Sequence, residues 1–277
     1  ISAHHHTNVF SIIFLRKLRK LKIIVIERSD ISELLIFNNF KNYIKNKIIY
    51  LLVKICYKKA NLIISNSKSG KKDLTQICNA KVINIPSPSF IKKTKKKLLN
   101  KIDILKLIAV GRLSKEKGNK IIIEALSKLK MKNFSMKILG SGPEKKNLLM
   151  MIKRYKLEKK IKLIGFKKNT KKYYQEANLF INASFFEGFP NAVVEAISYC
   201  VPVICSNCKG GAKEILLNGK GGEFFKSGNP KDLSEKIFLF YKNPKFLNNK
   251  LRFARKNIHN FSIKNHVNRY ESVFRNI

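Results

Sequence analysis

Residues 181–207, INASFFEGFPNAVVEAISYCVPVICSN, contain the clearest fold signal in the chain. An apolar run at 179–181 predicts a short strand, and the glycine and proline in EGFP at 187–190 end it. Apolar residues then recur at helical spacing as far as Ile197, and the run VPVI at 201–204 predicts a second strand. This order of strand, turn, helix and strand is typical of one βαβ unit.

The start of the predicted helix is expected to bind an anion. Pro190 is tolerated in a first turn because its missing N–H would have no partner there. The free N–H groups of residues 191–193 would point out of the helix and attract a phosphate or carboxylate. Glu187 and Glu195 flank this point, and a carboxylate beside a phosphate is acceptable where it binds sugar or ribose hydroxyls. The stretch therefore predicts a pocket for a phosphorylated, polyhydroxylated ligand.

Length and composition indicate a globular chain with room for two domains. The 277 residues are 44% hydrophobic and 27% charged, which excludes a disordered or membrane-spanning class. No apolar run approaches the roughly 18–20 residues that a membrane-spanning helix needs. The chain starts without Met, inside what resembles a strand-to-helix transition, so we expect that an N-terminal part is missing. No secretory signal is assigned to such a chain.

The chain is strongly basic, with 58 Lys and Arg against 17 Asp and Glu and a formal net charge of +41. Three explanations stay open: a compositional bias toward Lys, Asn and Ile, attraction to an anionic membrane, and nucleic-acid binding. The basic residues are spread along the chain without a nucleic-acid-binding motif, which argues against the third. The segment Asn8–Lys22 favours the second, as a basic amphipathic face that lies on a membrane. This segment contains Val9, Phe10, Ile12, Ile13, Phe14, Leu15, Arg16, Lys17, Arg19, Lys20 and Lys22.

Alternating strands and helices predict parallel sheets in two domains. Residues 1–88 are interpreted as part of an α/β domain, residues 89–103 as a linker with a basic run, and residues 104–260 as a second α/β domain. The second series is doubly wound and Rossmann-like, with ligands expected at the carboxyl ends of its strands. Strands are predicted at 23–26, 62–65, 82–86, 106–110, 134–139, 160–164 and 222–225. Helices are predicted at 43–59, 67–78 (capped by Ser67), 119–130, 169–177, 232–241, 244–259 and 261–274.

Cations and glycines follow the strand at 106–110. Arg112 and Lys117 lie between Gly111 and Gly118, which let the backbone approach a ligand. Arg offers a planar fork and Lys a point charge for phosphate oxygens, so the two could neutralise a leaving diphosphate without a metal. The four aspartates are all far apart, so the chain lacks an Asp-x-Asp metal pattern. Cys205 and Cys208 form a single pair and are interpreted as buried thiols in a reducing cytoplasm.

The string EGFP at 187–190 followed by Glu195-Ala196 resembles the E-x7-E signature of the retaining GT-B glycosyltransferases of family 4, also called glycosyl transferases group 1. The resemblance covers nearly all of residues 105–260, and the end of the chain, 261–277, resembles the helix that crosses back to the N-terminal domain. It implies two Rossmann-like domains that face a cleft, with the N-terminal one incomplete here. In that case Arg112 and Lys117 would hold the donor diphosphate, and Glu187 would contact the sugar at the reacting centre.

The resemblance also implies a set of donor-binding residues. Glu195 would bind the ribose, and the backbone from Gly188 to Val193 would bind sugar and phosphate. One of His4, His5 and His6 would face the donor sugar. The turn at 140–143 needs no ligand to explain it, and the residues at 164–167 could equally be a core strand end. The implied donor-binding set is Gly111, Gly140, Gly142, Phe166, Lys167, Gly188, Phe189, Pro190, Asn191, Ala192, Val193 and Glu195.

The resemblance implies a metal-independent enzyme that moves a sugar from a nucleotide-diphospho-sugar, foremost a UDP-sugar, to a glycan or lipid-linked acceptor with retention of configuration. It would work in the cytoplasm at the inner face of the membrane, on bacterial surface glycans, without nucleic acid. A GT-B nucleotide-sugar epimerase and a non-catalytic nucleotide-sugar-binding subunit stay open as alternatives. Two features depart from the family: Cys200 stands where Gly is common, and the glycine-rich first loop of the N-terminal domain is absent.

Overall fold

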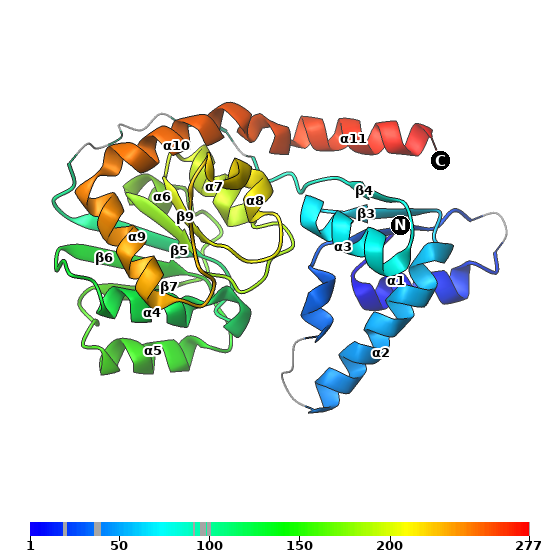
Figure 1. Cartoon of the computed structure of the whole chain (residues 1–277), viewed down its shortest axis with the longest axis horizontal. Coiled ribbons are helices and arrows are strands. Elements are labelled where there is room, and N and C mark those ends of the chain that lie inside the picture. Colours follow the sequence, from blue (N-terminus) through cyan, green and yellow to red (C-terminus); the bar gives the residue numbers. More distant parts are fainter. Residues whose placement is uncertain (19–20, 36–39, 91, 95–97, 99–100, 277) are drawn as a thin grey trace.

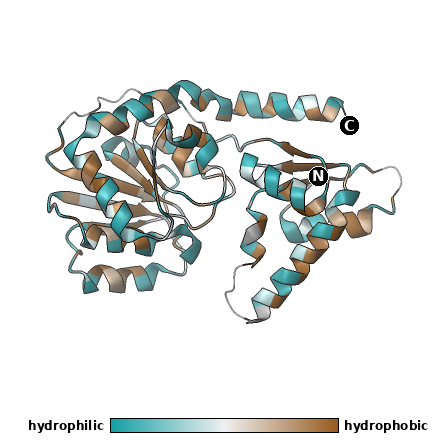
Figure 2. Cartoon of the chain, viewed as in Figure 1, coloured by the Kyte–Doolittle hydropathy of each residue, from teal (hydrophilic) through white to brown (hydrophobic). Residues whose placement is uncertain are grey.

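The computed structural model describes residues 1–18, 21–35, 40–90, 92–94, 98 and 101–276. The chain forms two parallel β-sheets with helices on both faces of each, so it belongs to the α/β class (Figure 1). We call residues 1–90 the N-terminal lobe and residues 101–262 the C-terminal lobe. Both sheets are built from largely apolar strands, while most helices carry one apolar and one polar side (Figure 2). That pattern is expected for parallel strands that are buried on both faces.

The N-terminal lobe has a four-stranded sheet in the order β1-β2-β3-β4. Its helices α1, α2 and α3 pack on one face through a shared apolar core that includes Val9, Val25 and Val53. Ser67 caps α3, because its Oγ accepts a hydrogen bond of 3.1 Å from the Gly70 N–H, as predicted. The elements are β1 (Ser2–Ala3), α1 (His5–Leu15), β2 (Ile24–Glu27), η1 (Ile31–Leu35), α2 (Phe40–Cys56), η2 (Tyr57–Lys59), β3 (Leu62–Ser65), α3 (Lys68–Cys78) and β4 (Val82–Asn84).

The C-terminal lobe has a six-stranded sheet in the order β10-β9-β8-β5-β6-β7. The chain starts at the centre with β5, proceeds outward to β7, returns to β8 beside β5 and then proceeds to the other edge. The order therefore reverses between β5 and β8, which is where open parallel sheets bind ligands. The strands are β5 (Leu105–Val110), β6 (Phe134–Leu139), β7 (Ile161–Gly165), β8 (Leu179–Asn182), β9 (Val203–Ser206) and β10 (Glu223–Phe225).

Two apolar cores lie on opposite faces of this sheet. Helices α4, α5 and α9 cover one face, and α6, α7, α8 and α10 cover the other. Burial of these apolar side chains is what holds the lobe together. The helical elements are η3 (Lys115–Lys117), α4 (Asn119–Ser127), α5 (Lys145–Arg154), α6 (Lys171–Glu176), α7 (Asn191–Ser198), α8 (Ala212–Ile215), η4 (Leu217–Gly219), α9 (Pro230–Lys242), α10 (Pro244–Asn257) and η5 (Ile258–Phe261).

The last helix, α11 (Ile263–Arg275), leaves the C-terminal lobe and lies along the N-terminal sheet (Figure 1). Tyr270 and Val273 pack against the face of that sheet opposite to α1–α3. At the start of the crossing, His266 Nδ1 lies 2.8 Å from the Pro86 carbonyl oxygen. The end of the chain therefore joins the two lobes.

The segment Asn8–Lys22 differs from its prediction. Helix α1 ends at Leu15, and its residues Asn8, Val9 and Ile12 are buried in the lobe, so they contribute nothing to an exposed face. Arg19 and Lys20 lie outside the described residues. The apolar side chains that do face solvent are Phe10, Ile13, Phe14, Leu15, Leu18 and Leu21.

The helix end at Cys200 is left-handed, with φ of 61°. The Val201 N–H donates to the Ala196 carbonyl at 2.9 Å, which closes the end of α7 as a glycine-type cap would. The backbone is thus the one that Gly would adopt, and a Cys in this conformation carries a steric cost that Gly does not. Within the described residues, no helix is long and apolar enough to cross a membrane.

Candidate functional site

Two hollows lie at the carboxyl ends of the C-terminal strands, on either side of β5. The first has a volume of about 370 Å³ and lies between β5 and β8, at the point where the strand order reverses. The second has a volume of about 310 Å³ and lies toward β6 and β7. Both are lined by Val110, Gly111 and Arg112, so the two hollows adjoin across the end of β5. Together they can hold an elongated ligand with two chemically different ends.

Glycines let the loops around β5 pack closely. A Cβ on Gly140 would lie 1.8 Å from the Gly111 carbonyl oxygen, and one on Gly118 would lie 2.0 Å from that of Ala183. Neither position can accept a side chain without moving the backbone. Gly142 lines neither hollow and instead packs on the backbone of Leu113, where an added Cβ would lie 2.4 Å from the carbonyl oxygen.

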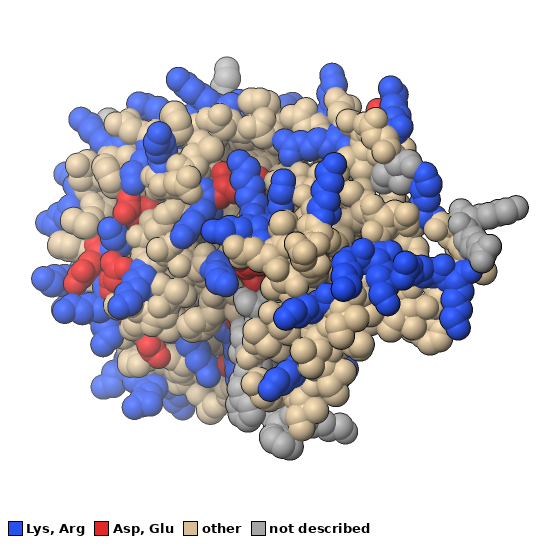
Figure 3. Space-filling view, turned by 45° about the vertical axis from the view of Figure 1, so that its right-hand side comes forward, with Lys and Arg blue, Asp and Glu red and all other residues tan. Residues whose placement is uncertain are grey.

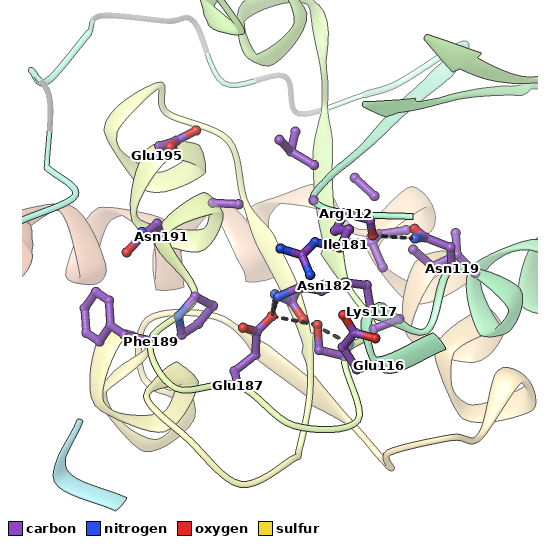
Figure 4. Close-up of a pocket in the computed structure, with 18 residues that line it drawn as sticks. Arg112, Glu116, Lys117, Asn119, Ile181, Asn182, Glu187, Phe189, Asn191 and Glu195 are labelled. Carbon is purple, nitrogen blue, oxygen red and sulfur yellow. Dashed lines mark hydrogen bonds and ion pairs between the residues drawn. The ribbon is translucent and has the colours of Figure 1, made fainter. Parts of the chain in front are cut away.

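Lys117 and Glu187 form an ion pair inside the first hollow, with 2.7 Å between Lys117 Nζ and Glu187 Oε1 (Figure 4). The same carboxylate oxygen accepts hydrogen bonds from Ser184 Oγ at 2.7 Å and Asn182 Nδ2 at 3.4 Å. Only 9% of the Glu187 side chain is exposed. A carboxylate with this set of donors is fixed in position and presents its other oxygen, Oε2, as an acceptor for a ligand hydroxyl.

Glu195 also lines the first hollow and has a different environment from that of Glu187. Burial raises its pKa, and the hydrogen bond that Tyr174 donates to its Oε2 at 3.1 Å acts in the opposite direction. The Tyr174 hydroxyl also lies 3.3 Å from the Ala192 carbonyl oxygen, which it can donate to instead. Tyr174 is fully buried, so Glu195 is oriented by the core of the lobe.

The start of α7 supplies the wall between these carboxylates. Pro190 is the N-cap of the helix, one position before the predicted first turn. Asn191 and Ala192 line the hollow. Val193 does not, because its side chain is buried in the core and its N–H donates to the Pro190 carbonyl at 3.0 Å. The prediction that the Val193 N–H is free for a ligand is therefore wrong.

Gly188 lines neither hollow and lies instead where the lobes meet. A Cβ on Gly188 would lie 1.9 Å from the carbonyl oxygen of Arg28, in the loop that follows β2. A second contact between the lobes lies nearby, where Glu214 Oε2 accepts a hydrogen bond of 2.9 Å from the Lys68 N–H at the start of α3. The loop that carries Glu187 is thus held against the N-terminal lobe.

The second hollow is lined by Gly140, Phe166 and Lys167 as well as by the shared residues. Phe166 is 74% exposed, so it is a surface ring rather than part of a core strand end. An exposed ring beside a cation offers a stacking surface for a planar ligand group.

The three histidines do not reach these hollows. His5 Nδ1 forms an ion pair of 2.7 Å with Glu27 Oε2 inside the N-terminal lobe, where Asn8 Nδ2 donates to the same carboxylate at 2.7 Å. Burial lowers the pKa of His5, but the contact with Glu27 and the nearby charges of Glu33 and Asp30 together outweigh it and leave the pKa raised. Among the described residues, no histidine lines either hollow, and that one of His4–His6 faces the donor sugar stays a prediction.

Sequence reasoning missed several residues of the site. Asn182 and Ser184 hold Glu187, and Tyr174 holds Glu195. Glu116 and Asn119 also line the first hollow. Asn182 ends β8 and Ser184 follows it, and this position was the available signal, because ligand contacts gather at strand ends.

Known proteins resemble the chain over most of its length. The family described as "Glycosyl transferases group 1" matches residues 90–257. The N-acetylgalactosamine-N,N'-diacetylbacillosaminyl-diphospho-undecaprenol 4-alpha-N-acetylgalactosaminyltransferase of Campylobacter jejuni is 34% identical over 208 residues, which are 73% of this chain and 56% of that protein. The amylovoran biosynthesis glycosyltransferase AmsD of Erwinia amylovora is 28% identical over 58% of this chain and 47% of its own length. The chain thus spans about half the length of these curated relatives.

Solved structures share the fold. Anabaena HepE in complex with UDP superposes with a TM-score of 0.80 at 20% identity, over 99% of this chain and 77% of that one. Staphylococcus aureus TarM, in a complex that contains UDP, superposes with a TM-score of 0.77 at 19% identity, over 96% of this chain and 54% of that one. At these identities the likeness concerns the fold alone.

Proposed function

The chain belongs to the glycosyl transferases group 1 family and has the GT-B fold, and from this premise we propose that it is a retaining glycosyltransferase of family 4. It transfers a sugar from a nucleotide-diphospho-sugar, foremost a UDP-sugar, to an acceptor. The proposal rests on the pair of adjoining hollows at the reversal of strand order, with Arg112 at their junction and Lys117, Glu187 and Glu195 in the first.

The donor spans both hollows. Arg112 at the junction and Lys117 bind the diphosphate, and the second hollow receives the base on Phe166 and Lys167. Glu195 accepts hydrogen bonds from the ribose. Glu187 accepts hydrogen bonds from the sugar beside the bond that breaks. Because Lys117 already contacts Glu187, one side chain links the sugar end of the donor to its diphosphate end.

The chemistry follows from this placement. Cleavage of the bond between sugar and diphosphate leaves negative charge on the diphosphate, and preorganised donors that face this charge lower the barrier. Arg112 and Lys117 supply those donors, which is why we propose a reaction without a metal. The acceptor enters from the side of the N-terminal lobe, and Glu187 orients the sugar without acting as a nucleophile.

The acceptor is a glycan or a lipid-linked saccharide of the bacterial surface. This part of the proposal is supported by the relatives, one of which bears a name that specifies a diphospho-undecaprenol substrate. A lipid-linked acceptor places the protein in the cytoplasm, at the inner face of the membrane. The net charge of +41 and the exposed apolar residues of α1 support contact with an anionic lipid surface.

Calorimetric titration with UDP and with GDP tests the donor site. We expect saturable binding of UDP by the chain and its loss in the Arg112→Ala, Lys117→Ala double variant. A matched control is Lys153→Ala, Arg154→Ala, which removes two exposed cations from α5, far from both hollows. Equal loss in both double variants, or failure of a folded chain to bind either nucleotide, would contradict the proposed donor site.

A further inference from the structure

Helix α2 carries an apolar stripe that no element of the described protein covers. Ile44, Ile48, Leu51 and Ile55 are 43%, 52%, 50% and 53% exposed. Their spacing of four, three and four residues places them on one side of the helix. The core side of the same helix is formed by Ile49 and Val53, which are buried. The stripe therefore does not serve the packing of the lobe.

The neighbouring helix α1 adds a second exposed apolar set. Phe10, Ile13 and Phe14 are 59%, 43% and 58% exposed, and the two phenylalanine rings lie 4.3 Å apart between centroids. Helices α1 and α2 pack against each other on the same face of the N-terminal sheet. Seven large apolar side chains thus face solvent from two adjacent helices of a chain whose sequence is otherwise rich in charge.

A basic cavity opens between these two helices at their C-terminal ends. It has a volume of about 340 Å³, and Arg16, Lys17 and Lys59 line it together with Ile12, Ile13 and Cys56. Among the described residues, no carboxylate forms an ion pair with any of the three cations. The cavity therefore combines unneutralised positive charge with an apolar wall, and Ile13 belongs both to this wall and to the exposed set of α1.

We propose that this α1–α2 face docks on an anionic phospholipid bilayer, with a lipid phosphate in the cavity of Arg16, Lys17 and Lys59. The exposed side chains of both helices enter the boundary between headgroups and acyl chains. The inference rests on the proposed contact with an anionic membrane and assigns the surface that makes it. It also extends that surface from the segment Asn8–Lys22 to the exposed apolar stripe of α2.

The composition of the face selects a bilayer over other anionic partners. A nucleic acid binds through cations that follow its phosphates and gains nothing from an exposed aliphatic stripe. A basic helix pair with large apolar side chains gains from both the anionic surface and the acyl boundary. Further exposed lysines on α2, at positions 45, 47 and 54, add to the surface charge. Figure 3 shows Lys and Arg side chains spread over this part of the molecule with broad uncharged surface between them.

Vesicle sedimentation tests the proposal on the chain as it stands, with phosphatidylcholine vesicles and with vesicles that also contain phosphatidylglycerol. The cation variant is Arg16→Gln, Lys17→Gln, Lys59→Gln, and the apolar variant is Ile48→Ser, Leu51→Ser. Helix α5 offers matched controls, because it also exposes cations and two apolar side chains. These controls are Lys146→Gln, Lys153→Gln, Arg154→Gln and Leu149→Ser, Met150→Ser.

We expect the chain to bind the anionic vesicles and not the neutral ones. The cation variant should lose about tenfold or more in affinity, since each well-placed basic residue contributes several-fold. The apolar variant should lose a similar factor, and both α5 controls should stay within about twofold of the parent chain. UDP titration of the same variants reports on the donor site independently, so a failure of the docking face and a failure of the proposed donor site are distinguishable.

Three outcomes would overturn the proposal. Equal losses in the α1–α2 and α5 cation variants would show that the net charge alone attracts the vesicles. Unchanged binding by folded cation and apolar variants would place the membrane contact elsewhere. A dimer in solution that the Ile48→Ser, Leu51→Ser variant dissociates, without effect on vesicle binding, would show that a second copy covers this face.

Discussion

The two lobes use the carboxylates at the ends of their strands in different ways. At the end of β2, Glu27 is 1% exposed and is surrounded by His5, Asn8 and Tyr57, which all contact it. After β8, Glu187 also has three donors, but it lines an open hollow of about 370 Å³. The cluster around Glu27 is closed and stabilises the fold, whereas the cluster around Glu187 is open and can bind a ligand.

The difference in enclosure indicates which of the two carboxylates is available to a ligand. A buried carboxylate with all its partners inside the protein is costly to disturb and has no capacity left for a ligand. A carboxylate whose donors all contact one oxygen, as at Glu187, keeps its other oxygen for a ligand. Substitutions at each carboxylate cluster and at the contact between the lobes distinguish these two cases.

Glu27→Ala should destabilise the protein by about 3–5 kcal/mol, because it leaves the buried groups of His5, Asn8 and Tyr57 without their acceptor. Denaturant unfolding measures the loss. The exposed Glu158→Ala is the control and should change the free energy of unfolding by less than about 0.5 kcal/mol. An unfolding midpoint of Glu27→Ala equal to that of the parent chain would refute a structural role for this cluster.

Lys117→Met should weaken UDP binding by about 10–100-fold while the protein stays folded, because a charged hydrogen bond to the diphosphate is lost. Titration calorimetry measures the affinity. Lys115→Met removes an exposed cation from the same turn, η3, and should bind UDP nearly as well as the parent chain. If both variants lose affinity equally, general charge rather than the position of Lys117 holds the nucleotide.

Gly188→Ala should disturb the contact between the lobes, because the added methyl group would lie 1.9 Å from the Arg28 carbonyl oxygen. We expect a cost of about 1–3 kcal/mol, typical of overpacking, and a larger radius of gyration in small-angle X-ray scattering. Gly111→Ala is the control, because its added methyl group meets nothing closer than 3.8 Å. A radius of gyration that rises equally in both variants would argue against a contact at Gly188.

The ion pair of His5 and Glu27 should make stability depend on pH. The pKa of His5 is raised in the folded protein, so the stabilisation is fully present below the unfolded value of about 6.5 and is lost as the pH rises through the folded pKa. In urea unfolding, the difference between the parent chain and His5→Gln should therefore shrink as the pH rises. The exposed His259→Gln should show no such trend. A difference that stays constant with pH would contradict the ion pair.

Much of the local structure of both lobes could be predicted from the sequence. The strands, the doubly wound order, the cap at Ser67 and the strand-end loop of Arg112 and Lys117 all follow from patterns within a few residues. Other local predictions were less accurate. Pro190 caps α7 instead of entering its first turn, and the N–H of Val193 is already bound, because the exact start of a helix depends on how its flanking loop packs.

By itself, then, the sequence determined the βαβ unit at 181–207, the glycines that permit close loops and the presence of cations and carboxylates at strand ends. Periodicity and turn chemistry act between near neighbours, so they are readable without a structure. Which of these groups meet depends on the tertiary structure, because the partners lie far apart in the sequence. Lys117 and Glu187 pair across 70 positions, and Tyr174 reaches Glu195 from another helix. The tertiary structure also encloses the Glu27 cluster and leaves the apolar stripe of α2 exposed, because burial depends on which faces the fold brings together.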